Sequence, residues 1–291
     1  MGTRLMGRSL TLILITGAVL TCGAAAGATQ RTEKHFALKG RPVVAIQNVA
    51  DGRIEVKSSK NPEVVVVANQ NSNKINFDME QVGDRVDVTA NILDASAQPQ
   101  ELATSLQLTV PEETELQLKT ENGMIYVEQV RGDMTLESVA GDIHLKEVSG
   151  YIIVKTTGSS LVCTQCAGKL DFNSVGGSAQ ILQPALINVN LRTTTGNILF
   201  DGDFIRTGLY SMRSGKGVVE VRFSGNDSFD LSAKTNMGTL DNQAAAFLKP
   251  DSHSKWHLPK FTHGFIGTFG AGLAKVELST FSGTIRILKR D

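Results

Sequence analysis

Residues 123–140 read GMIYVEQVRGDMTLESVA, and residues 141–158 read GDIHLKEVSGYIIVKTTG. The two lines superimpose without a gap. Gly132, Gly150 and Gly168 share one column, because 150 − 132 and 168 − 150 both equal 18. A fixed short period of this kind is the signature of a repeat architecture, in which each unit buries its apolar face by stacking on its neighbours.

Within each unit the apolar residues alternate, as Ile125 and Val127 do, which is the period of a strand with one buried face. Helical spacing does not fit. Each unit therefore holds two short strands, with turns near Gly132 and Gly141, and stacking places equivalent residues about 4.8 Å apart. The sequence predicts an all-β fold, a parallel β-solenoid with about 18 residues per coil, and the period loosens after Ile181.

The first 28 residues predict a secretory signal peptide. Arg4 and Arg8 form a basic start, residues 10–19 are mostly apolar, and residues 26–28 offer an A-x-A cleavage site. The apolar run is shorter than the about 20 residues of a membrane-spanning helix. A lipoprotein acylated at Cys22 is the less favoured alternative, because threonine precedes this cysteine where a small residue is usual. We expect an exported chain, either periplasmic, cell-surface or extracellular, without a transmembrane segment in its mature part.

Charge and composition narrow the classes of partner. Removing residues 1–28 lowers the count of basic residues from 29 to 27 and leaves 29 acidic ones, so the mature net charge is 27 − 29 = −2. This balance argues against nucleic acid, because binding phosphates requires a basic face. Twenty-eight glycines, seven prolines and 5% aromatic residues favour an all-β repeat over a helical or doubly wound enzyme.

The mature chain divides by pattern rather than by a linker. Residues 29–118 read as ordinary strands separated by polar turns, and we expect this irregular β region to cap the first edge of the solenoid. Residues 119–291 form the repetitive part, with a loop insertion near residues 241–263. The strand, glycine turn, strand rhythm returns at residues 275–287, which we expect to finish the stack.

Three phrases carry a family resemblance: LTVPEETELQLKTENG at residues 108–123, the repeated G-x-I-x-[VL] units, and LSTFSGTIRI at residues 278–287. Together they resemble the bacterial putative-adhesin family of toast-rack type, a domain of unknown function. The resemblance implies an exported, right-handed β-solenoid. It supplies no catalytic residue, because its motifs are structural.

Paired carboxylates are the first chemistry to look for, because a glycosidase needs two acids about 5 to 9.5 Å apart. The repeat instead stacks Glu128 on Lys146 and Glu137 on Lys155, which is the arrangement of a solvated sheet. The sequence favours a non-catalytic scaffold that binds an envelope or surface macromolecule, either protein or polysaccharide. The alternative is a carbohydrate-binding or carbohydrate-active β-helix protein. No signature of a cofactor occurs.

Cys163 and Cys166 form a C-x-x-C pair in columns otherwise filled by apolar residues. A redox centre would need a helix N-terminus, and a zinc site would need two further ligands. Two interpretations remain open, buried free thiols and a disulfide. Extended backbone would hold the Cα atoms about 10 Å apart and forbid the disulfide, whereas a corner in the chain would permit it.

His253, Trp256, His257 and His263 lie in the least repetitive segment. The first two histidines have the spacing of helical metal ligands, but prolines bracket them and no acidic base follows. We expect a solvated loop rather than a metal site. Because loops on a rigid scaffold often carry binding, these residues are the sequence's first choice for a partner site.

Overall fold

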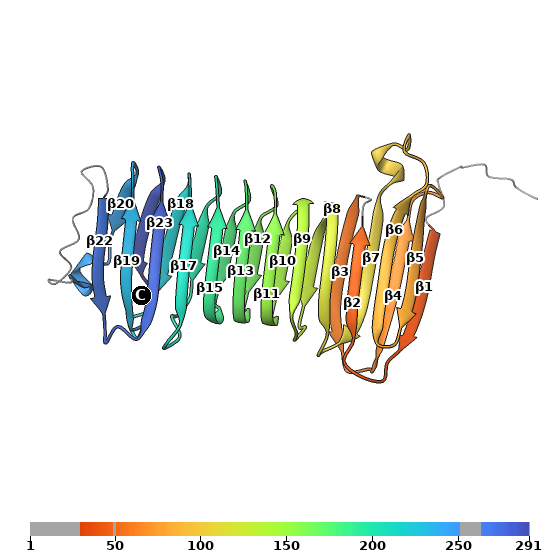
Figure 1. The fold of residues 1–291 in the computed structure, drawn as a ribbon, viewed down its shortest axis with the longest axis horizontal. Coiled ribbons are helices and arrows are strands. Elements are labelled where there is room, and N and C mark those ends of the chain that lie inside the picture. Colours follow the sequence, from red (N-terminus) through yellow and green to blue (C-terminus); the bar gives the residue numbers. More distant parts are fainter. Residues whose placement is uncertain (1–29, 49–50, 251–262, 291) are drawn as a thin grey trace, which may run out of the picture.

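The computed structural model describes residues 30–48, 51–250 and 263–290. Two long β-sheets, here called sheet A and sheet B, run side by side along the molecule and enclose one continuous hydrophobic core. Figure 1 shows the strands stacked in a row along the long axis. The predicted all-β parallel solenoid is confirmed.

Each regular coil contributes one short strand to sheet A and one longer strand to sheet B. The sheet A strands are β10 (Ile143–Lys146), β12 (Leu161–Thr164), β14 (Ala179–Leu182), β16 (Ile198–Asp201) and β18 (Val218–Phe223). The sheet B strands are β9 (Met134–Ala140), β11 (Ser149–Thr156), β13 (Ala167–Ser174), β15 (Ala185–Thr193) and β17 (Leu209–Ser214).

The register of the coils follows the 18-residue period. Ile143 pairs with Ile125 on one side and with Leu161 on the other, and all three side chains are buried. Apolar residues therefore form continuous interior columns, so that each coil completes the core of the next.

One corner of the coil lies at a position that the sequence analysis did not single out. Gln129, Glu147, Gln165 and Gln183, each 18 residues apart, have left-handed backbone with φ of 59°, 53°, 55° and 49°. The turn expected near Gly132 thus begins three residues earlier. A left-handed conformation costs a non-glycine residue roughly 1–2 kcal/mol, which packing of the buried residues on both sides must offset.

The other corner is closed by a ladder of hydroxyl groups. One residue of every coil, at the end of its sheet B strand, is Ser or Thr, in the order Thr120, Ser138, Thr156, Ser174, Thr193, Ser214, Thr280, Thr235. Each stands three residues before a glycine or, after Thr156, before Ser159. The Gly177 amide donates to the Ser174 hydroxyl at 2.7 Å, so this [ST]-x-x-G motif holds its own turn.

The N-terminal strands extend both sheets. They are β1 (Gln30–Ala37), β2 (Val43–Asn48), β3 (Gly52–Ser59), β4 (Glu63–Gln70), β5 (Ile75–Val82), β6 (Arg85–Ile92), β7 (Thr104–Pro111) and β8 (Glu115–Glu128), with a 3-10 turn at Pro99–Glu101. β8 serves both sheets and pairs in parallel with β2, β3, β9 and β10. Antiparallel β1, β4 and β5 complete this end.

The C-terminal end departs from chain order. Its strands are β19 (Phe229–Thr235), β20 (Thr239–Asn242), β21 (Lys249–Pro250), β22 (His263–Phe269), β23 (Ala274–Thr280) and β24 (Thr284–Lys289), with a 3-10 turn at Ala245–Phe247. β23 lies between β17 and β19, and β24 lies between β18 and β20. The last coil of the chain is therefore inserted into the stack, whereas the sequence analysis expected it to finish the stack.

Candidate functional site

The two cysteines lie at the corner formed by the left-handed residues. Gln165 turns the chain between Cys163 and Cys166, which brings their Cα atoms to 5.9 Å, and their sulfurs are bonded. Both side chains are fully buried. The extended geometry that would forbid a disulfide does not occur here, and burial gives this pair a structural role rather than a place in a surface site.

The histidine segment is only partly described. His253, Trp256 and His257 lie outside the described residues, as do Cys22 and the whole predicted signal peptide. His263 opens β22, where it is exposed and pairs with Thr235 in the antiparallel register. Among the described residues, no three His, Cys, Asp or Glu side chains converge as metal ligands would.

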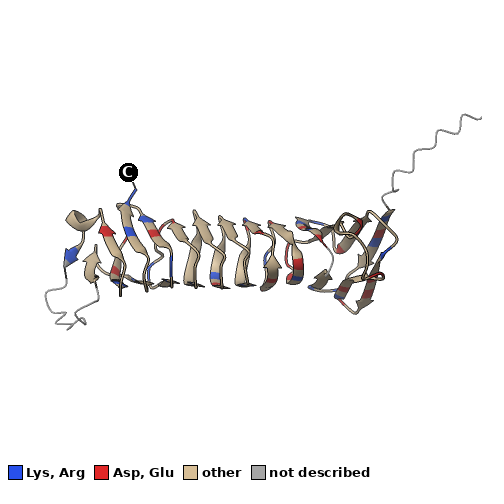
Figure 2. Cartoon of the chain, turned by 90° about the horizontal axis from the view of Figure 1, so that it is seen from above, with Lys and Arg blue, Asp and Glu red and all other residues tan. Residues whose placement is uncertain are grey.

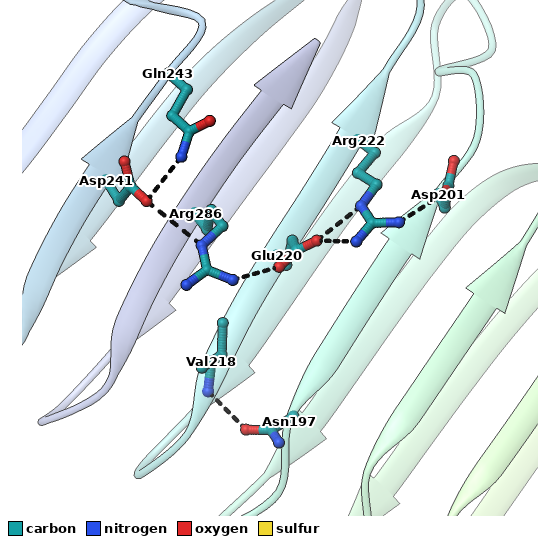
Figure 3. A network of polar contacts seen from close by, with 8 residues as sticks. All are labelled: Asn197, Asp201, Val218, Glu220, Arg222, Asp241, Gln243 and Arg286. Carbon is teal, nitrogen blue, oxygen red and sulfur yellow. Dashed lines mark hydrogen bonds and ion pairs between the residues drawn. The ribbon is translucent and has the colours of Figure 1, made fainter. Parts of the chain in front are cut away.

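On the outer face of sheet A, acidic and basic side chains form ion pairs with one another. Lys146 bonds Glu128 at 2.7 Å, as the 18-residue register predicts. Towards the C-terminal end a longer network crosses four strands and contains Asp201, Arg222, Glu220, Arg286 and Asp241 (Figure 3). Because acid and base alternate along it, this network stabilises the stack.

The outer face of sheet B is different, because shallow depressions lie along it. One of about 480 Å³ spans strands β13, β15, β17, β23 and β19 near the hydroxyl ladder, and a second of about 450 Å³ lies beside it. Arg192 and Arg213 line both. The two depressions therefore adjoin along these arginines, and together, across β13, β15, β17, β23 and β19, we call them the sheet B groove.

Three basic side chains follow one line through this groove. Arg192 pairs with Arg213 in register, Arg213 pairs with Ser279, and Ser279 pairs with Lys234. We call Arg192, Arg213 and Lys234 the basic row. All three side chains are exposed. From Asn173 on β13 to Lys234 on β19, no strand carries an acid at this register position. On the outer face of sheet A, by contrast, acids and bases occupy the same register position on neighbouring strands, as Glu128 and Lys146 do.

The basic row is only weakly neutralised. Arg213 lies 3.3 Å from Glu277, but both side chains are about half exposed, so the pair contributes little. Within the described ranges Arg192 and Lys234 have no ion-pair partner. Lys155, two strands before Arg192, is likewise paired with Glu137 at 3.3 Å. The unpaired positive charges of the basic row are therefore those of Arg192 and Lys234.

A chain of hydrogen bonds orients Arg192. Its Nε donates to Asn190 at 3.2 Å, the Asn190 amide donates to Asp171 at 2.8 Å, and the Tyr151 hydroxyl donates to Asp171 at 2.6 Å. The bond to Asp171 raises the pKa of Tyr151 above its usual value. The terminal nitrogens of Arg192 have no partner among the described residues, so an oriented guanidinium faces the groove.

Tyr210 lies beneath the groove, and its side chain is buried in the core. Its hydroxyl donates to the Leu186 carbonyl at 2.6 Å and accepts from the Ile205 amide at 2.8 Å. Burial raises the pKa of Tyr210 to about 12. This side chain supports the groove rather than offering a reactive phenol.

Sequence analysis missed the basic row because the period breaks between its members. Asn173 and Arg192 are 19 residues apart and Arg192 and Arg213 are 21 apart, whereas the ideal period is 18. A register shift lies between Gly168 and Lys169, and an irregular segment precedes β17. The [ST]-x-x-G motif, which keeps a constant position in each coil, is the signal that could have aligned these residues.

The geometry defines a two-sheet parallel β-solenoid with an open, basic groove on one face. A family model described as Toastrack DUF4097 matches residues 45–288, so the chain belongs to the Toastrack DUF4097 family. No curated protein matches the sequence. None of the helices in the described part of the chain is long and apolar enough to cross a membrane.

Several solved structures are similar to this chain at low identity, and the first of them supports the fold. A putative adhesin from Bacteroides fragilis has a TM-score of 0.52 and 13% identity, with 90% of this chain and 99% of that chain covered. A putative cell adhesion protein from Clostridium sporogenes has a TM-score of 0.28 at 10% identity, over 90% of this chain and 100% of that chain. A putative lipid binding protein from Parabacteroides distasonis has a TM-score of 0.33 at 11% identity, over 90% and 97%.

Proposed function

We propose that this chain is an exported, non-catalytic scaffold that binds a macromolecule of the cell envelope or surface through the sheet B groove. The observation that carries the proposal is the basic row, in which Arg192, Arg213 and Lys234 share one exposed line and Arg192 and Lys234 have no ion-pair partner among the described residues. Charges that are left unpaired along a rigid face favour association with an oppositely charged partner.

Export rests on the sequence of residues 1–28, and the adhesin name of the Bacteroides fragilis structure agrees with a surface role. The partner site that the sequence predicted, the histidine segment, adds His263 at the same end of the molecule as Lys234, since β22 pairs with β19. A partner lying in the groove could therefore reach both.

The carbohydrate-active alternative has less in its favour. A glycosidase needs two acids that face each other across the substrate. Glu220 instead lies between Arg222 and Arg286, and Glu128 lies against Lys146. These acids are engaged in ion pairs, which favours a binding protein over a hydrolase.

The test compares two charge reversals on the same sheet. Labelled protein is incubated with isolated envelopes of the native host, and we expect Arg192→Glu with Arg213→Glu to abolish sedimentation with them. The control, Arg85→Glu with Lys119→Glu on the outer face of β6 and β8, reverses the same number of charges and should sediment like wild type. Equal sedimentation of all three proteins would contradict the proposal. So would turnover of a polysaccharide or ester that a single Asp or Glu substitution abolishes.

A further inference from the structure

The positive charges of the sheet B groove come from several strands rather than from one. The basic row crosses four neighbouring strands, β15, β17, β23 and β19. Adjacent strands are about 4.8 Å apart, so Arg192 and Arg213 are neighbours and Lys234 lies about 10 Å beyond Arg213. The positive charges thus line up along the solenoid axis, perpendicular to the strands.

The lining between the cations is polar. It includes two acids that are already engaged, Asp171 with Tyr151 and Asn190 and Glu277 with Arg213, together with Lys275. Asn173, Asn188 and Ser211 present amides and a hydroxyl into the same depressions. Such groups both donate and accept hydrogen bonds, as sugar hydroxyls do.

An aromatic side chain stands at the rim. Phe281 lines the larger depression and is 51% exposed, and it follows Thr280 of the hydroxyl ladder. Its neighbour on the next coil, Met237, is 65% exposed, and the Met237 amide donates to the Phe281 carbonyl. Together they form a small apolar platform beside the basic row.

We propose that the sheet B groove binds an anionic glycan laid along the solenoid axis, with its acidic groups on the basic row and a sugar face on Phe281. This inference rests on the proposed function and names its partner class. The planar guanidinium of Arg192 is oriented by Asn190 and matches the two oxygens of a carboxylate or phosphate.

Other partner classes fit the groove less well. The core of a stable protein interface is depleted of charge and rich in aromatic residues, whereas of the two aromatic residues that line this groove Tyr210 is buried and Phe281 is exposed. Binding to a membrane surface needs a broad apolar face, and the platform consists of Phe281 and Met237 alone. Nucleic acid binding needs a strongly basic domain, and the net charge of this chain is zero.

The experiment measures the affinity of the purified protein for defined polymers. Polygalacturonate carries carboxylates, phosphomannan carries phosphates, and dextran is neutral. We expect binding to one or both anionic glycans, weakening as salt rises, and none to dextran. The two anionic arms distinguish carboxylate from phosphate as the recognised group.

Two matched pairs of variants locate the site. Arg192→Gln with Arg213→Gln should weaken binding about tenfold or more, because each substitution removes a charge-assisted contact with the glycan. The control, Arg85→Gln with Lys119→Gln, should not weaken binding. Phe281→Ser should weaken binding without changing its salt dependence. Val139→Ser, at the same turn position in a distant coil and 52% exposed, is its control.

Equal binding to dextran, tighter binding to duplex DNA or to anionic phospholipid vesicles, or no effect of the Arg192 and Arg213 substitutions would overturn the inference. Failure to bind any of the three glycans would also overturn it. If the same arginine pair still governed sedimentation with host envelopes, the proposed function would stand and only the partner class would be wrong.

Discussion

Arg286 on β24 donates a 2.8 Å hydrogen bond to Glu220 on β18, across 66 residues of sequence. Glu220 also accepts from Arg222 at 2.7 Å, and Arg286 reaches Asp241 on β20 at 3.4 Å (Figure 3). The pKa values of both arginines are raised by their bonds to Glu220. Arg286 therefore ties the inserted C-terminal coil to the strands on both of its sides, through Glu220 on β18 and Asp241 on β20.

Glu220→Gln should destabilise the C-terminal end. The Glu220 side chain is only 12% exposed, so the substitution weakens two charge-assisted contacts at a nearly buried position, at a cost of about 1–3 kcal/mol. Thermal unfolding should shift downwards and limited proteolysis should cut first within residues 224–290. Glu137→Gln, which breaks one exposed pair with Lys155, should cost less than about 1 kcal/mol. Equal losses in the two variants would show that the network does not lock the coil.

Two adjacent glycines should respond very differently to alanine. A Cβ on Gly177 would lie 1.8 Å from the Ser159 carbonyl oxygen of the neighbouring coil, so backbone must move. A Cβ on Gly176 would meet nothing closer than 3.6 Å. Gly177→Ala should lower the free energy of unfolding by about 3 kcal/mol or more. Gly176→Ala should change it by less than about 0.5 kcal/mol. Denaturant titration of both variants measures this, and similar values would contradict the close stacking of coils at this corner.

The disulfide should be inaccessible in the folded protein. Cys163 and Cys166 are fully buried at the corner formed by Gln165, so neither alkylating reagent nor reductant should reach them under native conditions. After unfolding, reduction should release both thiols together. Its effect on stability should be about 2 kcal/mol, because the closed loop is short. Alkylation of one cysteine in the native protein, detected by peptide mass, would contradict this geometry.

Charge is distributed unevenly along the molecule, and this bears on how the site could be found. In the view of Figure 2 the middle coils carry few charged residues, and most charge lies towards the two ends. Residues 172–200 hold a single charged residue, Arg192, so the basic row begins in the stretch of the repeat with the fewest charges. The groove lies where the period has loosened and alignment from sequence is weakest.

The sequence by itself determined the regular coils. Alternating apolar residues at a period of 18 allow one pairing of Ile125, Ile143 and Leu161, because a slip of one residue would turn every apolar side chain outward. The stacking of Lys146 on Glu128 follows from that register without further information. The corner at Gln165, which permits the disulfide, was left open because glutamine is not a residue that signals a left-handed turn.

The order of the last coils was decided only by the tertiary structure. Each coil presents similar strand edges, so periodicity does not specify whether β23 and β24 end the stack or enter it between β17–β18 and β19–β20. Contacts between distant residues, such as Glu220 with Arg286, favour the inserted arrangement. The same insertion places Ser279 between Arg213 and Lys234 and so sets the spacing of the basic row. A site built from such neighbours emerges only when the coils are packed together, because its members are adjacent in space and not in sequence.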